Sequence, residues 1–500
     1  MSRAHIPPRP HDVGGQALHL RLAQHLREQL RQQGTPPGTR LASVRACAQE
    51  HGVNPQTVVA AYDLLQAQGL VEARARQGFF VRSPAHAVPG TPVEPGGPRQ
   101  AREPDGAMES RLMPPIAAPI APPTHALALL RAGLARAGQP GAARAMPGCG
   151  SLPVEWLQAS PLAQALRRLL REGGTLQAAQ GYGCAEGDPR LRGQLARLLA
   201  EQEVAVPASQ LLLCNGATQA LDLVARSLLR AGDAVMVEQP GPPLAYAQLA
   251  RQGLRLLPVA RGPQGPDLSR VSHWARSRKP RLMVVSSRMH NPTGGDLATG
   301  CAHQLLELAR EHDFLIAEDD GYAALCDRGP ALLSAMDGLR RTLLLGSLSQ
   351  LLAPGWRVGF LAAPASLLQR LLETKLLAGL ASPALTERAL ALLFERGSVP
   401  RQAAALRERL ARARRQAVQA ARHQGCRFEL APRGLFGWVD TGVDTERLAL
   451  RLHERGWLIA PGRLFDPEAR PSTRMRLNFA HAQDPAFWCE YARALRACSD

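Results

Sequence analysis

The chain has 500 residues, 45% of them apolar and 20% charged, which is typical of globular proteins and long enough for two or three domains. No apolar run reaches the length of a membrane span and the N-terminus has no apolar signal segment, so we expect a cytoplasmic protein without a membrane partner. The net charge of +18 would suggest a nucleic-acid partner, but only two of the 60 basic residues are lysine. So strong an arginine bias indicates GC-rich coding, and the overall charge is therefore weak evidence for any partner. The nine cysteines form no CxxC pair, so we expect neither a metal site nor disulfides.

Residues 38–81 open with a pattern of two short helices joined by a tight turn. Ser43 can cap the first helix, which would stop at Gly52, and Asn54 can cap the second, whose first residue is a proline. The second helix has one apolar face, formed by Val58, Tyr62 and Leu65.

The run "LVEARARQGFFV" follows the second helix and predicts a hairpin with Gly78 near its tip. Residues 1–82 carry ten arginines against five acids, a basic balance for so small a segment. Residues 83–124 then hold eleven prolines in 42 positions and no sustained periodicity, which predicts an extended, semi-stiff linker.

Residues 145–497 alternate short apolar runs with helical patterns, which predicts a mostly parallel sheet covered by helices. Ligands bind such sheets at the loops that follow the strands, and several of these loops carry polar residues. Each is explained as well by structure as by function when taken alone. They are "NGATQAL" (215–221), "NPTG" (291–294), "EDDGY" (318–322) and "SLSQLLAPGWRVGF" (347–360). A fifth stretch, "RMRLNFA" (474–480), puts Arg476 inside an otherwise apolar strand, where an unpaired guanidinium would be costly.

Residues 14–82 resemble the winged helix-turn-helix of the GntR family of regulators, with Ala42 where that family usually has proline. The resemblance implies an operator of double-stranded DNA as a partner. It puts the start of the second helix in the major groove and the hairpin over the minor groove or the phosphates. The implied DNA-contacting residues are Arg45, Asn54, Gln56 and Thr57 on the helices and Arg74, Arg76, Gln77 and Gly78 on the wing.

These five stretches, in this order and spacing, resemble the fold-type I, class I/II aminotransferases, whose cofactor is pyridoxal 5'-phosphate (PLP). With the N-terminal module, the chain resembles the MocR subgroup of GntR regulators. The resemblance implies a multidomain fold. A mostly helical α+β winged helix-turn-helix would precede an α/β PLP-dependent transferase-like domain, which ends in a small α+β subdomain at about 385–497.

The same resemblance implies a role for each site residue. Asp319 would pair with the pyridine nitrogen, which lets the ring act as an electron sink, and Arg476 would grip the carboxylate of an amino-acid or amine effector. The ring hydroxyl would be bound by Asn291 and Tyr322. The phosphate would be bound by Ala217, Thr218, Ser347 and Arg357, and by Tyr182 from the partner subunit of a homodimer.

Two positions depart from the aminotransferase pattern. Gln350 stands where the family has the lysine whose amine forms the Schiff base with PLP and moves the proton, and an amide can do neither. Pro242 stands where an aromatic ring usually stacks on the pyridine, which removes about 1 kcal/mol of stacking. Neither lysine of the chain, Lys279 or Lys375, lies in a context that predicts a substitute.

Three hypotheses therefore remain open from the sequence. The first is a DNA-binding regulator whose aminotransferase-like domain is catalytically inactive, dimerises, and binds PLP or a PLP–amino-acid adduct without a covalent link. The second is a working aminotransferase with a DNA-binding appendage, against which Gln350 argues. The third is a dimerisation domain that binds no small molecule, which buried polar residues such as Arg476 oppose.

Overall fold

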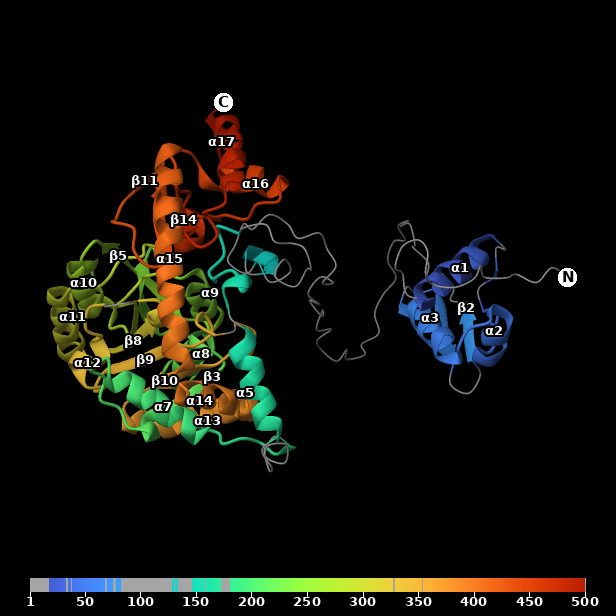
Figure 1. Cartoon of the computed structure of the whole chain (residues 1–500), viewed down its shortest axis with the longest axis horizontal. Helices are drawn as coiled ribbons and strands as arrows, with labels where there is room; N and C mark the ends of the chain where they lie inside the picture. The colour runs from blue at the N-terminus through green and yellow to red at the C-terminus, as the bar shows by residue number, and fades with distance from the viewer. Residues whose placement is uncertain are drawn as a thin grey trace, which may run out of the picture. The chain divides into compact units, whose positions relative to one another are not determined.

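The computed structural model describes residues 18–32, 35–36, 38–67, 70–74, 78–81, 128–129, 131–133, 146–157, 159–171, 180–326, 329–352 and 354–499. The chain divides into two compact units, Met1–Leu112 and Met113–Asp500, whose elements are labelled in Figure 1. The segment 83–124, predicted as a linker, lies outside the described residues.

The first unit is a winged helix-turn-helix, as predicted. Ser43 Oγ accepts a hydrogen bond from the N–H of Ala46 (3.2 Å) at the start of α2, and Gly52 ends that helix in the left-handed conformation. The core between the helices and the hairpin contains Leu22, Cys47, Val58, Tyr62, Leu65 and Val71. The elements are α1 (Leu18–Gln32), α2 (Val44–His51), α3 (Pro55–Ala67) and the antiparallel strands β1 (Val71–Arg74) and β2 (Gly78–Val81).

The second unit is built on a mixed eight-stranded sheet in the order β3-β10-β9-β8-β7-β4-β5-β6. The central neighbours β9, β8, β7, β4 and β5 are parallel, whereas β10 and β6 run against theirs. The strands are β3 (Leu211–Cys214), β4 (Ala234–Gln239), β5 (Arg255–Gly262), β6 (Gly265–Pro266), β7 (Leu282–Val285), β8 (Leu315–Asp320), β9 (Thr342–Ser347) and β10 (Gly359–Ala362).

Helices cover both faces of this sheet because its strands are apolar on both sides. One face packs against α8 (Ala217–Leu228), α9 (Pro243–Arg251) and α13 (Ala365–Gly379). The other packs against α10 (Leu268–Arg278), α11 (Thr299–Glu311) and α12 (Leu333–Asp337). Leu211 and Leu213 of β3 pack in a third cluster with α5 (Ala159–Arg171), α7 (Pro189–Ala200) and α14 (Ala384–Glu395).

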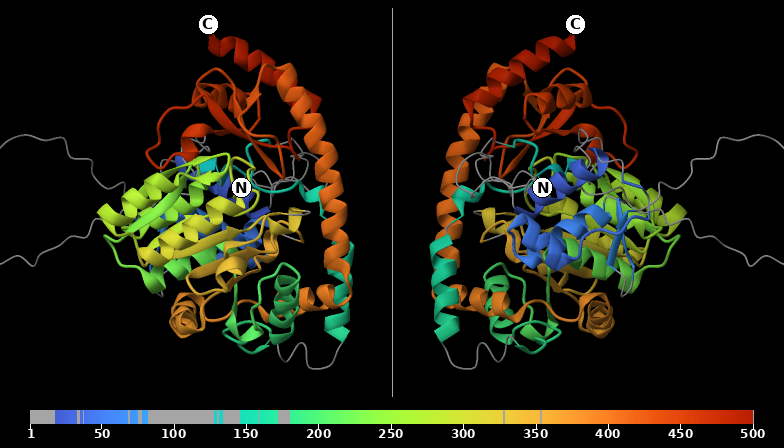
Figure 2. Two further views of the ribbon diagram at one scale, coloured as in Figure 1. Left: turned by 90° about the vertical axis from the view of Figure 1, so that its left-hand side faces the viewer. Right: turned by 90° about the vertical axis from the view of Figure 1, so that its right-hand side faces the viewer.

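A smaller antiparallel sheet follows in the order β11-β12-β14-β13, with α16 and α17 beside it. The 26-residue α15 joins the two parts, and Figure 2 shows it running along the edge of the unit from the small sheet toward α14. These elements are α15 (Ser398–His423), β11 (Arg427–Phe428), β12 (Phe436–Asp440), α16 (Thr445–Glu454), β13 (Ala460–Pro461), β14 (Arg474–Asn478) and α17 (Pro485–Ser499).

Short 3-10 helices lie in several connections: η1 (Val154–Trp156), η2 (Ala208–Gln210), η3 (Ala323–Leu325), η4 (Pro354–Trp356) and η5 (Gly462–Phe465). Within the described ranges, no helix combines the length and the apolar character needed to cross a membrane. The same residues contain no group of three His, Cys, Asp or Glu side chains that could hold a metal ion. The domain limits inferred from the sequence, including the one at about residue 385, stay predictions.

Candidate functional site

The N-terminus of α8 is open at the end of β3. The helix begins after Gly216, whose φ of 84° is left-handed, and no side chain caps it. Within the described part of the chain, the N–H groups of Ala217 and Thr218 have no acceptor. Free N–H groups at a helix start attract anions. Ala217 and Thr218 thus lie where a phosphate role needs them, although that role stays a prediction.

Arg357 lies against the same helix end. Its Nη2 donates to the carbonyl of Asn215 (2.8 Å) and its Nη1 to Ser349 Oγ (3.4 Å), while Ser347 Oγ accepts from the N–H of Ser349 (3.2 Å). A Cβ at Gly216 would lie only 2.7 Å from Arg357 Nη2, so any side chain there would displace the guanidinium. The turn after β9 and the start of α8 therefore form one cationic, donor-rich corner.

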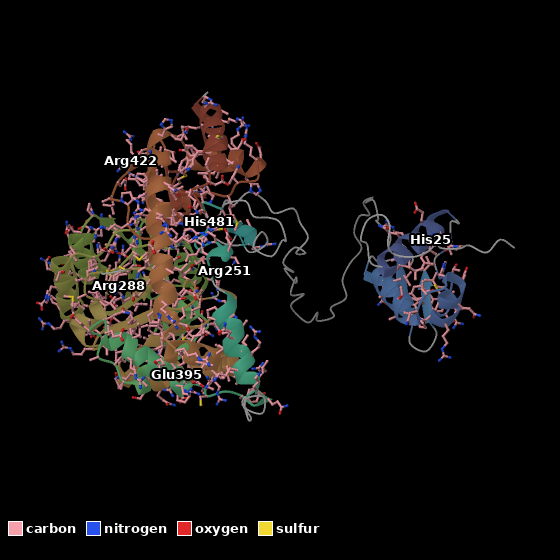
Figure 3. All side chains as sticks on the ribbon, viewed as in Figure 1. His25, Arg251, Arg288, Glu395, Arg422 and His481 are labelled. Carbon is pink, nitrogen blue, oxygen red and sulfur yellow. The ribbon has the colours of Figure 1, made fainter. Side chains whose placement is uncertain are left out.

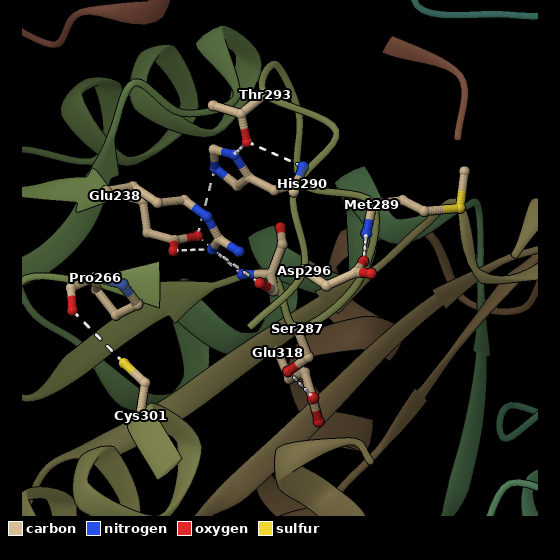
Figure 4. Close-up of polar contacts among 12 residues, drawn as sticks. Glu238, Pro266, Ser287, Met289, His290, Thr293, Asp296, Cys301 and Glu318 are labelled. Carbon is tan, nitrogen blue, oxygen red and sulfur yellow. Dashed lines mark hydrogen bonds and ion pairs between the residues drawn. The ribbon is translucent and has the colours of Figure 1, made fainter. Parts of the chain in front are cut away.

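The loop after β7 carries Asn291 and is held by its own polar contacts (Figure 4). The N–H of Met289 donates to Asp296 Oδ1 (3.0 Å), and His290 Nδ1 lies 2.9 Å from Thr293 Oγ1. Burial lowers the pKa of His290 well below its usual value, so the ring is neutral. The loop thus presents Asn291 on a fixed backbone.

A buried ion pair lies beneath this loop. Glu238 of β4 and Arg261 of β5 have side chains only 2% and 1% exposed. Ser286, the residue after β7, donates its N–H to Glu238 (2.9 Å) and accepts from Arg261 at its carbonyl (2.9 Å). Burial raises the pKa of Glu238, and the Arg261 charge opposes that shift. The pair joins the ends of three neighbouring strands where the Asn291 loop begins.

Asp319 and Tyr322 lie at the end of β8. Asp319 Oδ1 accepts from the N–H of Gly321 (3.0 Å), and burial raises the pKa of Asp319 to about 6. Tyr322 donates its hydroxyl to the carbonyl of Gly150 (3.2 Å), and burial raises its pKa to about 12. A cation brought beside such a carboxylate stabilises its ionised form.

Arg476 projects from β14 and is buried. Its Nη1 donates to Asn291 Oδ1 (2.9 Å) and its Nη2 to the carbonyl of Gly148 (2.6 Å), while Nε has no partner among the described residues. The guanidinium lies 4.6 Å from the ring centre of Phe436 and 5.0 Å from that of Phe465. Aromatic faces favour a cation, but desolvation still lowers the pKa of Arg476.

The segment 146–151 crosses this site and is held by the small sheet. Asn478 Nδ2 donates to the carbonyls of Cys149 (2.9 Å) and Ser151 (2.8 Å). Arg476 donates to the carbonyl of Gly148 and Tyr322 to that of Gly150. Together these side chains bind four successive carbonyls of the segment.

Gln350 lies in the turn between β9 and η4, and its Oε1 is buried without a partner in the described structure. The two lysines of the chain lie elsewhere. Lys279 is exposed at the end of α10, before β7 begins. Lys375 is buried in α13, where its Nζ donates to the carbonyl of Ala185. The structure therefore brings no lysine to the turn that carries Gln350.

Tyr182 and Pro242 also have definite places. Tyr182 is 88% exposed, and its role in a second copy of the chain stays a prediction. Pro242 is the N-cap residue of α9. The ring-stacking position inferred from the sequence stays a prediction.

The predicted DNA-contacting residues lie on the helix-turn-helix and the wing. Arg45 is exposed on α2, Asn54 directly precedes α3, and Thr57 is half-buried in its first turn. Gln56 lies on α3, Arg74 ends β1 and Gly78 begins β2, whereas Arg76 and Gln77 lie outside the described residues.

The sequence interpretation missed several residues that shape the site. Asn478 is the second polar side chain inside the apolar strand β14, and the reasoning applied to Arg476 would have found it. Glu238 is likewise a polar residue in an otherwise apolar strand, near the end of β4. Arg261 and the carbonyl of Gly148 carry no local signal, because their importance arises from partners far along the chain.

Comparison with known proteins assigns the two parts of the chain to two different families. Residues 18–81 match the family model "Bacterial regulatory proteins, gntR family", and residues 150–486 match "Aminotransferase class I and II". The HTH-type transcriptional regulator TauR of Rhodobacter capsulatus is 31% identical over 97% of this chain and 98% of its own length. The probable rhizopine catabolism regulatory protein MocR of Rhizobium meliloti is 28% identical over 70% of this chain and 66% of its own.

Among solved structures, the crystal structure of LysN, an α-aminoadipate aminotransferase from Thermus thermophilus, is similar to the second unit. It was solved in complex with N-(5'-phosphopyridoxyl)-L-leucine. The match has a TM-score of 0.66 at 27% identity and covers 71% of this chain and 93% of that one.

Fold and site together define a fold-type I aminotransferase domain on the same chain as a winged helix-turn-helix. The alignment with TauR covers 97% of the chain and therefore extends over both parts. The protein belongs to the GntR family of helix-turn-helix transcriptional regulators, in its MocR-type group with an aminotransferase class I and II domain.

Proposed function

We propose that this regulator binds PLP, or an adduct of PLP with an amino acid, without a covalent link, and that its aminotransferase-like domain senses and dimerises instead of catalysing. The observation that carries the proposal is Gln350 in the turn between β9 and η4, with both lysines of the chain elsewhere. A glutamine amide is not a nucleophile or a base, so it cannot take over an amine's part in catalysis.

The residues of the site fit PLP. The open start of α8 and Arg357 suit a phosphate dianion. Asp319 suits the protonated pyridine nitrogen, because a cation beside it would stabilise its ionised form. Tyr322 and Asn291 lie close enough to Arg476 to share one ligand with it. Bound PLP supplies an electron sink for amino-acid chemistry, and this chain would hold it without a group to move the substrate proton.

Arg476 would bind the carboxylate of the effector. Its unpartnered Nε suits an anion that pairs with the guanidinium in two bonds. The effector class is therefore an amino acid or a related amine that bears a carboxylate.

A homodimer would complete the phosphate site, since Tyr182 is 88% exposed and accessible to a second copy of the chain. Two winged modules in one dimer would read an operator with two half-sites. In each module, Arg45 and the start of α3 would contact the DNA together with the wing.

The ligand-free alternative also has an observation in its favour. Two nitrogens of Arg476 are already bound by Asn291 and Gly148, so the site is partly satisfied by the chain alone. The open end of α8 and the half-buried Asp319 favour the ligand-binding proposal, because neither group has a charged partner in the described structure.

Absorption spectroscopy tests the proposal. PLP added to the purified protein is expected to give a bound chromophore that survives gel filtration but is not fixed to the protein by borohydride. Borohydride fixation at a lysine would favour the active enzyme, and the absence of any bound chromophore would favour the ligand-free domain. The variant Gln350→Lys is the matched control, because it restores the amine and should make the chromophore reducible onto residue 350.

A further inference from the structure

Lysine is almost absent from this chain, and one of its two lysines is buried. Among 60 basic residues only Lys279 and Lys375 are lysine. Lys279 is exposed, whereas Lys375 is 2% exposed in the middle of α13. Burying an ammonium is costly unless it has a specific partner. Arginine, which the chain uses elsewhere, would bring five donors to a position that offers few acceptors.

Lys375 and a neighbouring acid hold the same short segment of backbone. Lys375 Nζ donates to the carbonyl of Ala185. Glu387 of α14, also 2% exposed, accepts from the N–H of Asp188 at 2.8 Å. One residue therefore binds a carbonyl and the other an N–H three residues later, from two different helices.

The rest of the segment is equally constrained. The carbonyl of Glu186 accepts from the N–H of Leu213 in β3 (2.8 Å). Gly187 has a φ of 103°, and a Cβ there would collide with Leu213. Asp188 caps α7 by accepting from the N–H groups of Arg190 (2.9 Å) and Leu191 (3.1 Å).

The helices that supply these contacts are themselves joined. Glu395, labelled in Figure 3, ends α14 and pairs with Arg190 of α7 at 2.7 Å. Thr374, next to Lys375, bonds through its hydroxyl to Ser227 in the last turn of α8 (2.8 Å). This bond joins α13 to the end of α8 opposite to the turn that forms the candidate phosphate site.

The electrostatic setting disfavours the charged form of both Lys375 and Glu387. Burial lowers the pKa of Lys375, with Cys214 and Glu387 acting in the opposite direction. Burial also raises the pKa of Glu387 to about 7, against the influence of the Asp188 N–H and of Lys375. Burial therefore makes the charged form of each residue unfavourable. If packing were their only role, apolar residues would be expected at both positions.

We propose that Lys375 and Glu387 are positioning residues that hold the segment 183–188 rigid, so that Tyr182 stands out from one subunit in the arrangement that completes the phosphate site of the other. Tyr182 directly precedes this segment and is 88% exposed. The part of the inference that concerns the second subunit rests on the proposed function, whereas the rigid hold on the segment does not.

Hydrogen exchange on the full-length protein, measured without PLP, tests whether Lys375 and Glu387 keep the segment 183–188 rigid. In Lys375→Met, the N–H groups of residues 183–188 should exchange about tenfold faster, because one anchoring bond is lost. Exchange in β4 and β7 should be unchanged. Lys279→Met is the matched control and should exchange like the unaltered protein throughout. If Lys375→Met does not fold, Glu387→Met replaces it. Unchanged exchange at 183–188 would overturn the proposal.

Mixed dimers test whether the effect crosses to the partner. Arg357→Ala is first used to disable one site of each dimer. When Lys375→Met lies in the same subunit as Arg357→Ala, the intact site receives the loosened Tyr182, and its affinity for PLP should fall about tenfold. When Lys375→Met lies in the other subunit, the intact site receives a normal Tyr182 and should bind within about twofold of the control.

Equal losses in the two arrangements would overturn the positioning of Tyr182 in the partner. If the unaltered protein binds no PLP, the proposed function fails, and the exchange measurement alone decides whether Lys375 and Glu387 hold the segment.

Discussion

The substitution Glu238→Gln removes one charge from the buried pair beneath the Asn291 loop. Glu238 accepts from Arg261 and from the N–H of Ser286 (2.9 Å), and both side chains of the pair are almost fully buried. Glutamine keeps one acceptor oxygen and puts an NH2 group against these donors. It also leaves the Arg261 charge without a counter-ion. Breaking a buried pair in this way costs about 3–5 kcal/mol.

Tryptophan fluorescence is the assay, because all six tryptophans lie at or beyond residue 156 and therefore report on the second unit alone. In a urea titration, Glu238→Gln should lower the midpoint of this transition by about 1 M or more. Hydrogen exchange should rise in the loop that carries Asn291, because the start of that loop is bound to the pair.

The matched control is Glu307→Gln in α11. Glu307 faces Arg310 at 3.8 Å, with both side chains more than 70% exposed, and losing such a pair changes stability by about 0.5 kcal/mol or less. The reasoning is refuted if Glu238→Gln shifts the urea midpoint no further than Glu307→Gln does.

Three further substitutions have definite expected outcomes. Burial raises the pKa of Asp319 to about 6, above its unfolded value, so its ionisation should weaken the fold by up to about 3 kcal/mol as the pH rises from about 4 to 6. Asp319→Asn should remove that part of the pH dependence, and equal urea midpoint differences between pH 4.5 and 7 in both proteins would contradict this. Arg45→Ala should weaken DNA binding and lower the slope of log K against log salt concentration by about one. Arg310→Ala should change neither quantity, and binding titrations at several salt concentrations distinguish the two variants. Ser43→Ala removes the cap of α2 and should cost about 1 kcal/mol, seen as faster hydrogen exchange in residues 44–51 but not in α8.

Local signals in the sequence were enough for much of the fold. Ser43 and Gly52 mark the limits of α2 because capping and left-handed geometry depend on the residues themselves. The start of α8 and the place of Asp319 near the end of β8 follow from apolar runs that end in polar residues. The order of these elements then indicated a mostly parallel sheet, which the structure confirms.

Contacts between distant parts of the chain could not be predicted in this way. The main-chain partner of Arg476 is 328 residues away in sequence, and Glu238 meets Arg261 only because β4 and β5 are neighbours in the sheet. Lys375 gave no signal beyond its rarity. Its role depends on the carbonyl of Ala185, and a backbone atom leaves no mark on the sequence pattern.

The bond between Arg476 Nη2 and the carbonyl of Gly148 has a consequence for the segment 146–151. Residues 146–151 precede β3 in the chain, and the residues that hold them are the ones that would meet a ligand. A carboxylate bound at Nε and at the second N–H of Nη2 would therefore share one guanidinium with the carbonyl of Gly148. The same side chain would then contact the ligand and the main chain of residues 146–151.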